Sequence, residues 1–203
     1  MVNEGVNTGL TAGVAKVCIT PPVGVWQGGF GGRSRPCEGI HDDLHARALV
    51  LGNPEPQAAI VSLDVVGLTH EVADRARRLA EAATGIPAEK IALCTSHTHG
   101  GPAIYGLVGY QPEPDPEYLG VLERYVAGAV TAAARELAPV SVRLGRSRAS
   151  FTVNRRRRNP DGSVEGYDPA GVADPEVLVV RLDRVNAGED VSTTQQDSLT
   201  NSP

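Results

Sequence analysis

Short apolar runs alternate with turn residues along the first third of the chain, which is the pattern of β-strands joined by short connections. Residues 13–20 predict one strand, which ends at Pro21-Pro22 because proline has no N–H to donate to a sheet. Two further runs, 46–51 and 58–66, are separated by Asn-Pro-Glu-Pro and predict a pair of strands. The second run is almost entirely apolar, so we expect it to lie at the centre of a sheet.

Two longer segments have the periodicity of amphipathic helices. Residues 70–84 place alanine, valine and leucine on one face and charged residues on the other, and residues 116–137 carry a second apolar stripe. Further apolar runs predict three more strands, at 91–94, 140–144 and 177–182. The order strand, helix, strand around the first helix predicts a βαβ crossover. The fold class is therefore α/β, with a mixed sheet and flanking helices.

The composition excludes several classes of protein. With 203 residues and 41% hydrophobic content, the chain is large enough to bury a core. The net charge of −5 leaves no basic excess for a phosphate backbone, so we expect no nucleic-acid partner. We expect no integral membrane span and find no signal peptide, so the chain as written is cytoplasmic. Three cysteines at no metal-ligand spacing argue against a disulfide framework and a zinc knuckle.

The end of the chain differs from the rest. Residues 185–203 contain few sizeable apolar side chains, which predicts a disordered polar tail after a partial catalytic domain at 1–184. A strand as apolar as 177–182 normally lies inside a sheet, yet nothing after it in the sequence is apolar enough to cover it. We therefore expect a truncated fold, whose exposed core would favour self-association.

Two histidines follow the predicted strand 91–94, in the segment Ser-His-Thr-His-Gly-Gly-Pro that begins at Ser96. Side chains two residues apart in extended backbone project to the same side, so His97 and His99 can converge on one ion or one substrate. Neutral imidazole suits zinc, although a catalytic zinc usually has three protein ligands. The alternative is that both rings are ordinary hydrogen-bonded residues of a strand-end turn.

Three other acidic or histidine residues are weaker candidates. His41 ends a long glycine-rich loop, residues 23–41, of the kind that often carries function. Asp64 ends a predicted strand, where it would orient a histidine, bind a metal, or be a simple polar strand-end residue. His70 is expected to be a solvated residue at a helix start.

Four consecutive arginines, Arg155–Arg158, follow Asn154 in a polar segment between the last two predicted strands. They are either a solvated charge run or a clamp for a substrate carboxylate or carbonyl, because guanidinium groups suit recognition of oxygen pairs. The chain has no Gly-x-Ser-x-Gly elbow and no Walker loop, so the histidines must carry the chemistry.

Six segments, taken in this order, resemble the N-terminal catalytic region of the neutral/alkaline non-lysosomal ceramidase family: AGVAKVCITPPVGV, GGFGGRSRPCEGIHDDLHARALVLG, AAIVSLDVVGL, GIPAEKIALCTSHTHGGPA, VNRRRRNPDG and DPEVLVVRLDR. The resemblance runs from about Thr11 to Arg184 and is nearest to the bacterial ceramidase-like branch. The family's Thr-His-Thr-His-Ser-Gly-Pro corresponds to residues 96–102, with departures at Ser96 and Gly100.

Characterised members of this family are zinc amidohydrolases that cleave the N-acyl bond of ceramide to sphingosine and a fatty acid. The resemblance therefore implies a lipid amide hydrolase with Zn2+ as cofactor and a small lipid amide, or another N-acyl compound, as substrate. His97 resembles a zinc ligand and His99 a residue that faces the substrate. Gly29 resembles the glycine that lines the family's substrate entrance, and Arg155 resembles its active-site arginine. We assign substrate binding also to the residue before that arginine, Asn154, and to His41.

The resemblance also suggests a rival hypothesis. In the family, a second histidine, a glutamate and a tyrosine complete the zinc site, and these and a catalytic serine come from sequence beyond the strand that corresponds to 177–182. The rival is therefore a catalytically inactive fragment that lacks the remaining ligands. A third hypothesis is an unrelated amidohydrolase, in which a His-x-His motif ends the first strand of a metal-binding barrel. Family members are often secreted, so the localisation stays open.

Overall fold

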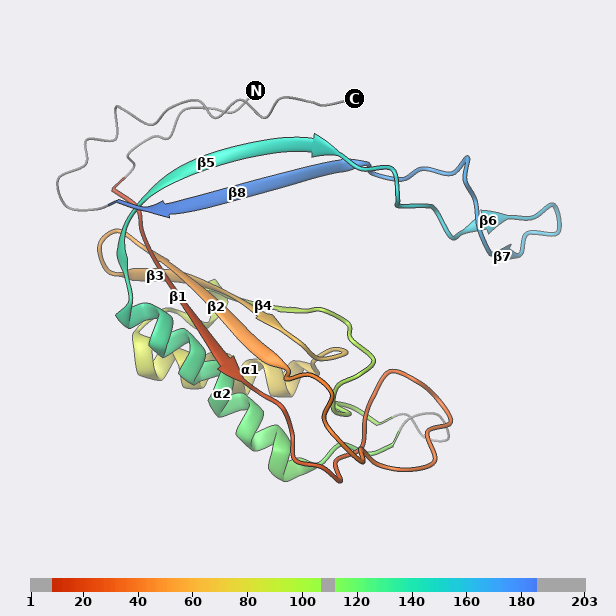
Figure 1. Cartoon of the computed structure of the whole chain (residues 1–203), viewed down its shortest axis with the longest axis horizontal. Helices are drawn as coiled ribbons and strands as arrows, with labels where there is room; N and C mark the ends of the chain where they lie inside the picture. Colours follow the sequence, from red (N-terminus) through yellow and green to blue (C-terminus); the bar gives the residue numbers. More distant parts are fainter. Residues whose placement is uncertain (1–8, 107–111, 186–203) are drawn as a thin grey trace. The chain divides into compact units, whose positions relative to one another are not determined.

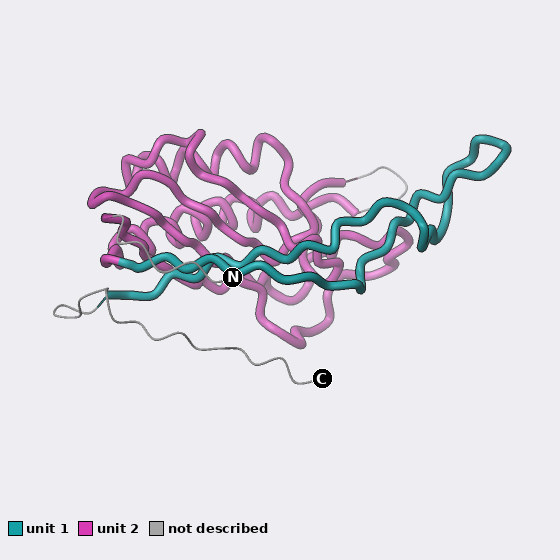
Figure 2. Tube along the Cα trace, turned by 90° about the horizontal axis from the view of Figure 1, so that it is seen from above, with its two compact units in different colours: residues 1–8, 140–203 teal, residues 9–139 magenta. Residues whose placement is uncertain are grey.

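The computed structural model describes residues 9–106 and 112–185. The chain divides into two compact units, one of residues 9–139 and one of residues 140–203 together with 1–8 (Figure 2). The predicted catalytic domain over 1–184 stays a prediction. The predicted polar tail lies, apart from Val185, outside the described residues.

The larger unit is built on a sheet in which buried and exposed side chains alternate. Its strands are β1 (Thr11–Cys18), β2 (His45–Gly52), β3 (Pro56–Leu63) and β4 (Ile91–Thr95). β2 pairs antiparallel with both β1 and β3, and β4 pairs parallel to β3 (Figure 1). The connection between the two parallel strands contains the helix α1 (His70–Thr84), so the predicted βαβ crossover is confirmed. The central position predicted for the third strand is confirmed as well.

The helices α1 and α2 (Pro116–Arg135) cover one face of this sheet (Figure 1). Thr69 caps the start of α1 by accepting a hydrogen bond from the N–H of Val72, and Gly85 ends the helix in a left-handed conformation. A short 3₁₀ turn, η1 (Ala88–Lys90), leads into β4. The core between helices and sheet consists mainly of alanine, valine, leucine and isoleucine side chains, among them Ala48, Val50, Val61, Leu63, Ala76, Ala80, Leu122, Val126 and Val130.

Two polar contacts fix the helices in this unit. The Tyr118 hydroxyl at the start of α2 donates a 2.6 Å hydrogen bond to the carbonyl of Ile19, and both residues are buried. Burial raises the pKa of this phenol above its ordinary value. Between the helices, the Nε and Nη2 atoms of Arg75 each lie 2.8 Å from Oε1 of Glu123, which is only 7% exposed.

The other face of the sheet is exposed among the described residues. Val14 is 63% exposed and Ile60 is 46% exposed, although both lie in apolar strands. Strand pairing aligns them in one row across β1 to β4, the row Val14, Leu49, Ile60 and Ala92. The apolar run in β3 therefore reflects its central place in the sheet and the helices on one face, not cover on both faces.

The strand β5 (Ala138–Arg148) begins in the larger unit, where its first two residues pair with β1, and continues into the smaller unit. There it pairs antiparallel with β8 (Glu176–Arg184). In hydrogen-bonding order the strands are β4-β3-β2-β1-β5-β8, so the predicted α/β class with a mixed sheet and flanking helices is confirmed. The predicted loop between β5 and β8 contains a small hairpin of β6 (Arg157–Arg158) and β7 (Val164–Glu165).

The apolar strand β8 is exposed along much of its length. Leu178 is 64% exposed and Val180 is 62% exposed. The strand is held to β5 by its ladder and by the ion pair of Asp183 with Arg143 in β5. Asp183 also pairs with Arg181 in its own strand. Burial acts to raise the pKa of Asp183, but hydrogen bonds from the two arginines outweigh it and lower this pKa. Within the described ranges, no helix combines the length and apolarity that crossing a bilayer requires.

Candidate active site

The candidate site lies where three strands of the larger unit end. β1 and β3 run in the same direction because β2 is antiparallel to both, and β4 is parallel to β3. The segments that follow these three strands therefore leave the sheet at the same edge. In α/β sheets this edge, at the carboxyl ends of the strands, is where ligands commonly bind.

His97 follows β4 after a single residue and has an unusual backbone conformation. The N–H of Ser96 still bonds to the carbonyl of Leu63 at 2.9 Å, as in the strand pairing before it. His97 then adopts a φ of 57°, in the left-handed region that residues other than glycine rarely occupy. Such a conformation turns the chain sharply out of the strand and directs the imidazole away from the sheet ladder, and it is frequent at functional positions.

The ring of His97 is oriented by a backbone carbonyl. Its Nδ1 lies 2.7 Å from the carbonyl oxygen of Val66, in the segment that follows β3. A carbonyl only accepts, so Nδ1 carries the proton and Nε2 keeps its lone pair in the neutral ring. This is the arrangement in which a histidine binds a metal through one nitrogen while the other donates to a carbonyl. Zinc therefore fits this side chain as one ligand.

His99 packs into the glycine-rich loop that follows β1. Its ring centroid lies 4.7 Å from that of Phe30 at an interplanar angle of 77°, and 5.0 Å from that of His97. Gly29 has a φ of 94°, and a Cβ added to it would lie 2.8 Å from both Cβ and Cδ2 of His99. The loop thus approaches the imidazole so closely that only glycine leaves room for the ring. The structure brings together Gly29, His97 and His99, three of the residues singled out in the sequence.

Main-chain hydrogen bonds join the glycine-rich loop to the histidine turn. The N–H of Gly28 donates to the carbonyl of Gly101 at 3.0 Å, and the N–H of Ala103 donates to the carbonyl of Trp26 at 2.8 Å. Gln27 and Pro102 form an antiparallel bridge between these bonds. The two loops therefore form one backbone-supported structure around His99.

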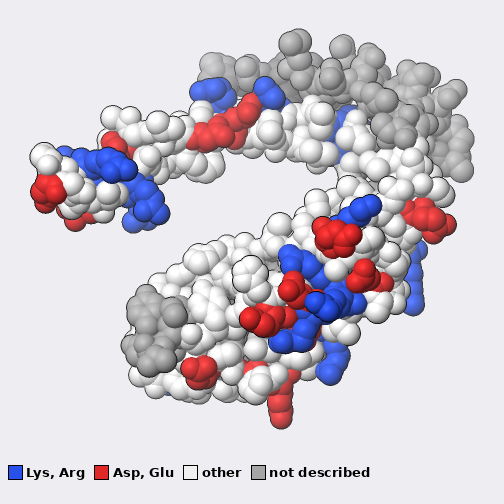
Figure 3. Space-filling model, turned by 180° about the vertical axis from the view of Figure 1, so that it is seen from behind, with Lys and Arg blue, Asp and Glu red and all other residues white. Residues whose placement is uncertain are grey.

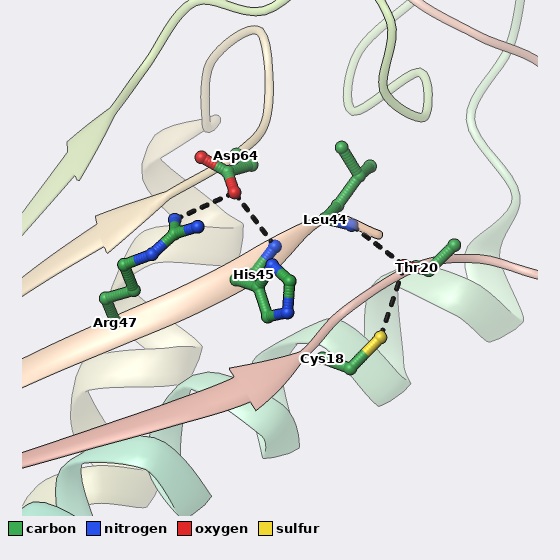
Figure 4. Close-up of polar contacts among 6 residues, drawn as sticks. All are labelled: Cys18, Thr20, Leu44, His45, Arg47 and Asp64. Atoms are coloured by element: carbon green, nitrogen blue, oxygen red, sulfur yellow. Dashed lines mark hydrogen bonds and ion pairs between the residues drawn. The ribbon is translucent and has the colours of Figure 1, made fainter. Parts of the chain in front are cut away.

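Asp64 lies next to this structure, but its carboxylate serves another purpose. Its Oδ2 accepts a 3.0 Å hydrogen bond from the N–H of His45 and forms an ion pair with Nη1 of Arg47 at 2.8 Å (Figure 4). The side chain therefore anchors the start of β2. For His97, the orienting role that the sequence suggested for Asp64 falls to the Val66 carbonyl.

Two other histidines lie at the surface. His41 has a side chain that is 96% exposed, and its Nδ1 lies 2.6 Å from Oδ2 of the neighbouring Asp42. It is not part of the contacts described above around His97 and His99, and its role in substrate binding stays a prediction. His70 is the exposed first residue of α1 after the cap Thr69, as expected.

Asn154 and Arg155 belong to the smaller unit, and the site described here belongs to the larger one. The Asn154 amide donates to the carbonyl of Val172 and its Oδ1 accepts from the N–H of Arg156, each at 2.8 Å. The side chain of Arg155 is exposed. Figure 3 shows basic side chains gathered at the tip that carries β6 and β7, with acidic ones beside them. The catalytic role of Arg155 and the binding role of Asn154 stay predictions.

Three contributors to this geometry were missed in the sequence. The Val66 carbonyl gives no signal because any residue type supplies it. Phe30, which packs on the His99 ring, and Arg33, whose Nη2 donates a 2.7 Å hydrogen bond to the His99 carbonyl, lie in the glycine-rich loop. An aromatic and a cationic side chain among glycines are the available signal there. Among the described residues, no group of three or more His, Cys, Asp and Glu side chains is placed to hold a metal ion. The described residues therefore show no complete set of zinc ligands, and the role of His97 as one ligand stays a prediction.

Comparison with known proteins places the fold. No protein-family model matches the sequence, and no curated protein matches it. Among solved structures, the chain is similar to neutral ceramidase from Pseudomonas aeruginosa, with 20% identity and a TM-score of 0.65 over 85% of this chain. It is similar to the same degree to a structure described as ceramidase complexed with C2, with 19% identity over 86% of this chain and a TM-score of 0.65.

The chain therefore has a ceramidase-like fold, as the sequence resemblance predicted. It spans 29% of the length of each of these two ceramidase chains.

Proposed function

We propose that this chain is a zinc-dependent amide hydrolase that cleaves the N-acyl bond of ceramide or a related N-acyl compound. The products are an amine, a sphingoid base in the case of ceramide, and a fatty acid. The observation that carries the proposal is the pair of oriented imidazoles at the carboxyl end of β4, with Nδ1 of His97 on the Val66 carbonyl and the ring of His99 against Gly29. The ceramidase-like fold supports the same class of reaction.

In this proposal His97 holds the zinc ion through Nε2. A bound zinc ion lowers the pKa of a water molecule to about 7 and polarises an acyl carbonyl, which is the chemistry that amide hydrolysis requires. In the overall reaction the water oxygen bonds to the acyl carbon, the C–N bond breaks, and a water proton passes to the leaving nitrogen. The remaining zinc ligands would come from outside the residues gathered here.

His99 would face the substrate in this arrangement. Its ring is held by Phe30 and by His97, and it offers a ring nitrogen to the acyl or amide group. Phe30 is 58% exposed beside it and presents apolar surface, which suits a lipid chain better than a polar metabolite. Gly29 would let the loop hold the His99 ring closely at the substrate entrance, because the ring occupies the space that a Cβ would take.

A second candidate is the catalytically inactive fragment, which at most binds metal weakly or associates with another chain. The exposure of Leu178 and Val180 on β8 favours it, because apolar strands of this kind are normally covered. Self-association through this apolar surface is part of this second proposal.

Zinc stoichiometry and amide hydrolysis, measured on one purified preparation, test both candidates. The first predicts close to one zinc per chain, release of fatty acid from an N-acyl lipid, and loss of turnover on chelation with recovery on adding zinc. His97→Ala should lose zinc and turnover, whereas His99→Ala should keep zinc and lose turnover. His70→Ala is the matched control, since that histidine is exposed at the start of α1, and it should change neither. Neither zinc nor turnover in the unmodified chain would refute the first candidate and support the second.

A further inference from the structure

We propose that Arg33 is a positioning residue for His99, holding it in place from the main-chain side. Arg33 lies in the glycine-rich loop, and its Nη2 donates a 2.7 Å hydrogen bond to the carbonyl oxygen of His99. Its Nη1 donates at 2.8 Å to Oε1 of Gln27, three residues before Phe30 in the same loop. One guanidinium group therefore bonds both to the histidine and to the loop that packs against its ring.

The same guanidinium group also contacts the ring that packs against His99. The Cζ of Arg33 lies 5.4 Å from the centroid of Phe30, within the range of a cation–π interaction. Phe30 in turn meets the His99 ring at 4.7 Å, edge to face. Arg33 thus acts on His99 twice, once through its carbonyl and once through the aromatic ring beside its imidazole.

Arg33 is half-buried, and the environment of its Nε shows that its placement is demanding. Its Nε is buried and lacks a hydrogen-bond partner among the described residues. Leaving a buried donor unpaired costs free energy, so the two charge-assisted bonds of Nη1 and Nη2 and the Phe30 contact must offset that cost. A surface arginine with a solvated head would have no such cost to offset.

His97 is positioned by a separate contact. Its Nδ1 bonds to the Val66 carbonyl, in the segment after β3, and not to the glycine-rich loop. Loss of Arg33 should therefore disturb His99 while the Nδ1 bond of His97 persists. This selectivity distinguishes a positioning role from a general contribution to stability, which would affect both rings.

The test that needs no substrate is NMR of the histidine ring signals in the full chain. In Arg33→Met, which keeps an unbranched apolar stem but no donors, the His99 ring signals should shift or broaden. The His97 signals should change less, because that ring only contacts His99 at 5.0 Å and keeps its own bond to Val66, and the His70 signals should stay in place. Arg33→Lys should give a smaller change in the same direction, because the single ammonium group of lysine does not reach both the Gln27 side chain and the His99 carbonyl as the planar guanidinium does. The matched control is Arg35→Met, since Arg35 is in the same loop but pairs with Glu38 at the surface.

The second test rests on the proposed function. Arg33→Met should lower kcat for the N-acyl lipid by about 10- to 100-fold, as expected for a small misplacement of a reacting group, with little change in KM. Zinc content should stay as in the unmodified chain. If the unmodified chain shows no hydrolysis, the proposed function fails, but the ring signals still decide the role of Arg33.

Unchanged His99 ring signals in folded Arg33→Met would overturn the inference, and so would equal shifts of the His97 and His99 signals. If Arg33→Met does not fold, Arg33→Lys and Gln27→Leu decide instead. Gln27→Leu removes the side-chain oxygen that accepts from Nη1 of Arg33, and it should shift the His99 signals in the same direction by a smaller amount. Absence of a His99 shift in both of these variants would also overturn the inference.

Discussion

Substitution of Gly29 by alanine tests whether the close approach of the glycine-rich loop controls the position of His99. The added methyl group would lie 2.8 Å from two atoms of the His99 side chain and nearer still to its Cγ. Gly29 also has a φ of 94°, where any side chain strains the backbone. The substitution therefore has two effects, a steric one on His99 and a conformational one on the loop.

The size of each effect follows from the geometry. Carbon atoms pack at about 3.5 to 4.0 Å, so the imidazole must retreat by about 1 Å to accept the methyl group. A displacement of this size at a catalytic group costs about 100-fold in rate. The backbone strain costs about 1–3 kcal/mol of stability.

A matched control separates the two effects. Gly24 lies in the same loop with a φ of 101°, and a Cβ added there meets nothing within 4 Å. Gly24→Ala should therefore lose a similar free energy of unfolding in urea, while keeping the His99 ring signals and the rate of amide hydrolysis. If Gly29→Ala matches Gly24→Ala in both the ring signals and the rate, the close approach has no influence on His99 and the reasoning is wrong.

Three further predictions concern the framework around the site. Arg75→Ala should destabilise the chain more than Glu123→Gln, by about 3 kcal/mol against about 1 kcal/mol in urea unfolding, because it leaves a buried carboxylate without its partner. Tyr118→Phe should cost about 1–3 kcal/mol by leaving the Ile19 carbonyl unpaired. Folding raises the pKa of the Tyr118 phenol, so the stability that its neutral form provides is complete below the ordinary pKa of 10.0 and is lost as the pH rises above that value. In alkali the free energy of unfolding should therefore fall for this reason in the unmodified chain, but not in Tyr118→Phe. The pKa of Asp183 is lowered, so its ionised form stabilises β8 near neutral pH, and Asp183→Asn should speed amide hydrogen exchange in β8 there. The difference in exchange rate between the variant and the unmodified chain should shrink as the pH falls below 3.8. A difference that grows in acid would contradict this prediction.

The secondary structure was predictable where local signals are strong. The helix predicted at 70–84 has these bounds in the structure, because Thr69 supplies the cap and Gly85 the left-handed end. The strand predicted at 140–144 extends to Ala138–Arg148, because its last four residues, Gly145–Arg148, pair with β8 but carry no apolar side chain. Apolar periodicity does not detect a strand of that kind.

The closeness of His97 and His99 could be predicted from the sequence, but the backbone that produces it could not. The prediction assumed extended backbone through both residues, which is wrong because His97 adopts a φ of 57°. The roles of the two histidines stay predictions. The Val66 carbonyl that orients His97 was invisible, since hydrogen bonding by a main-chain oxygen does not depend on residue type. The engagement of Asp64 by Arg47 was also hidden, because it depends on which residues the register of β2 and β3 places side by side.

Strand direction brings Gly29, His97 and His41 to the same edge of the sheet, but it does not decide which of these predicted residues meet. Gly29 follows β1 and His97 follows β4, far apart in sequence, but both strands run toward the same edge of the sheet. His41 precedes β2, which runs away from that edge, so it starts on the correct side of the molecule and yet lies in an exposed stretch paired with Asp42. Proximity to the edge is therefore necessary but not sufficient. The residues that meet His99 do so because main-chain bonds between Trp26–Gly28 and Gly101–Ala103 bind their loop to the histidine turn, and those bonds could be inferred only after the strand pairing was known.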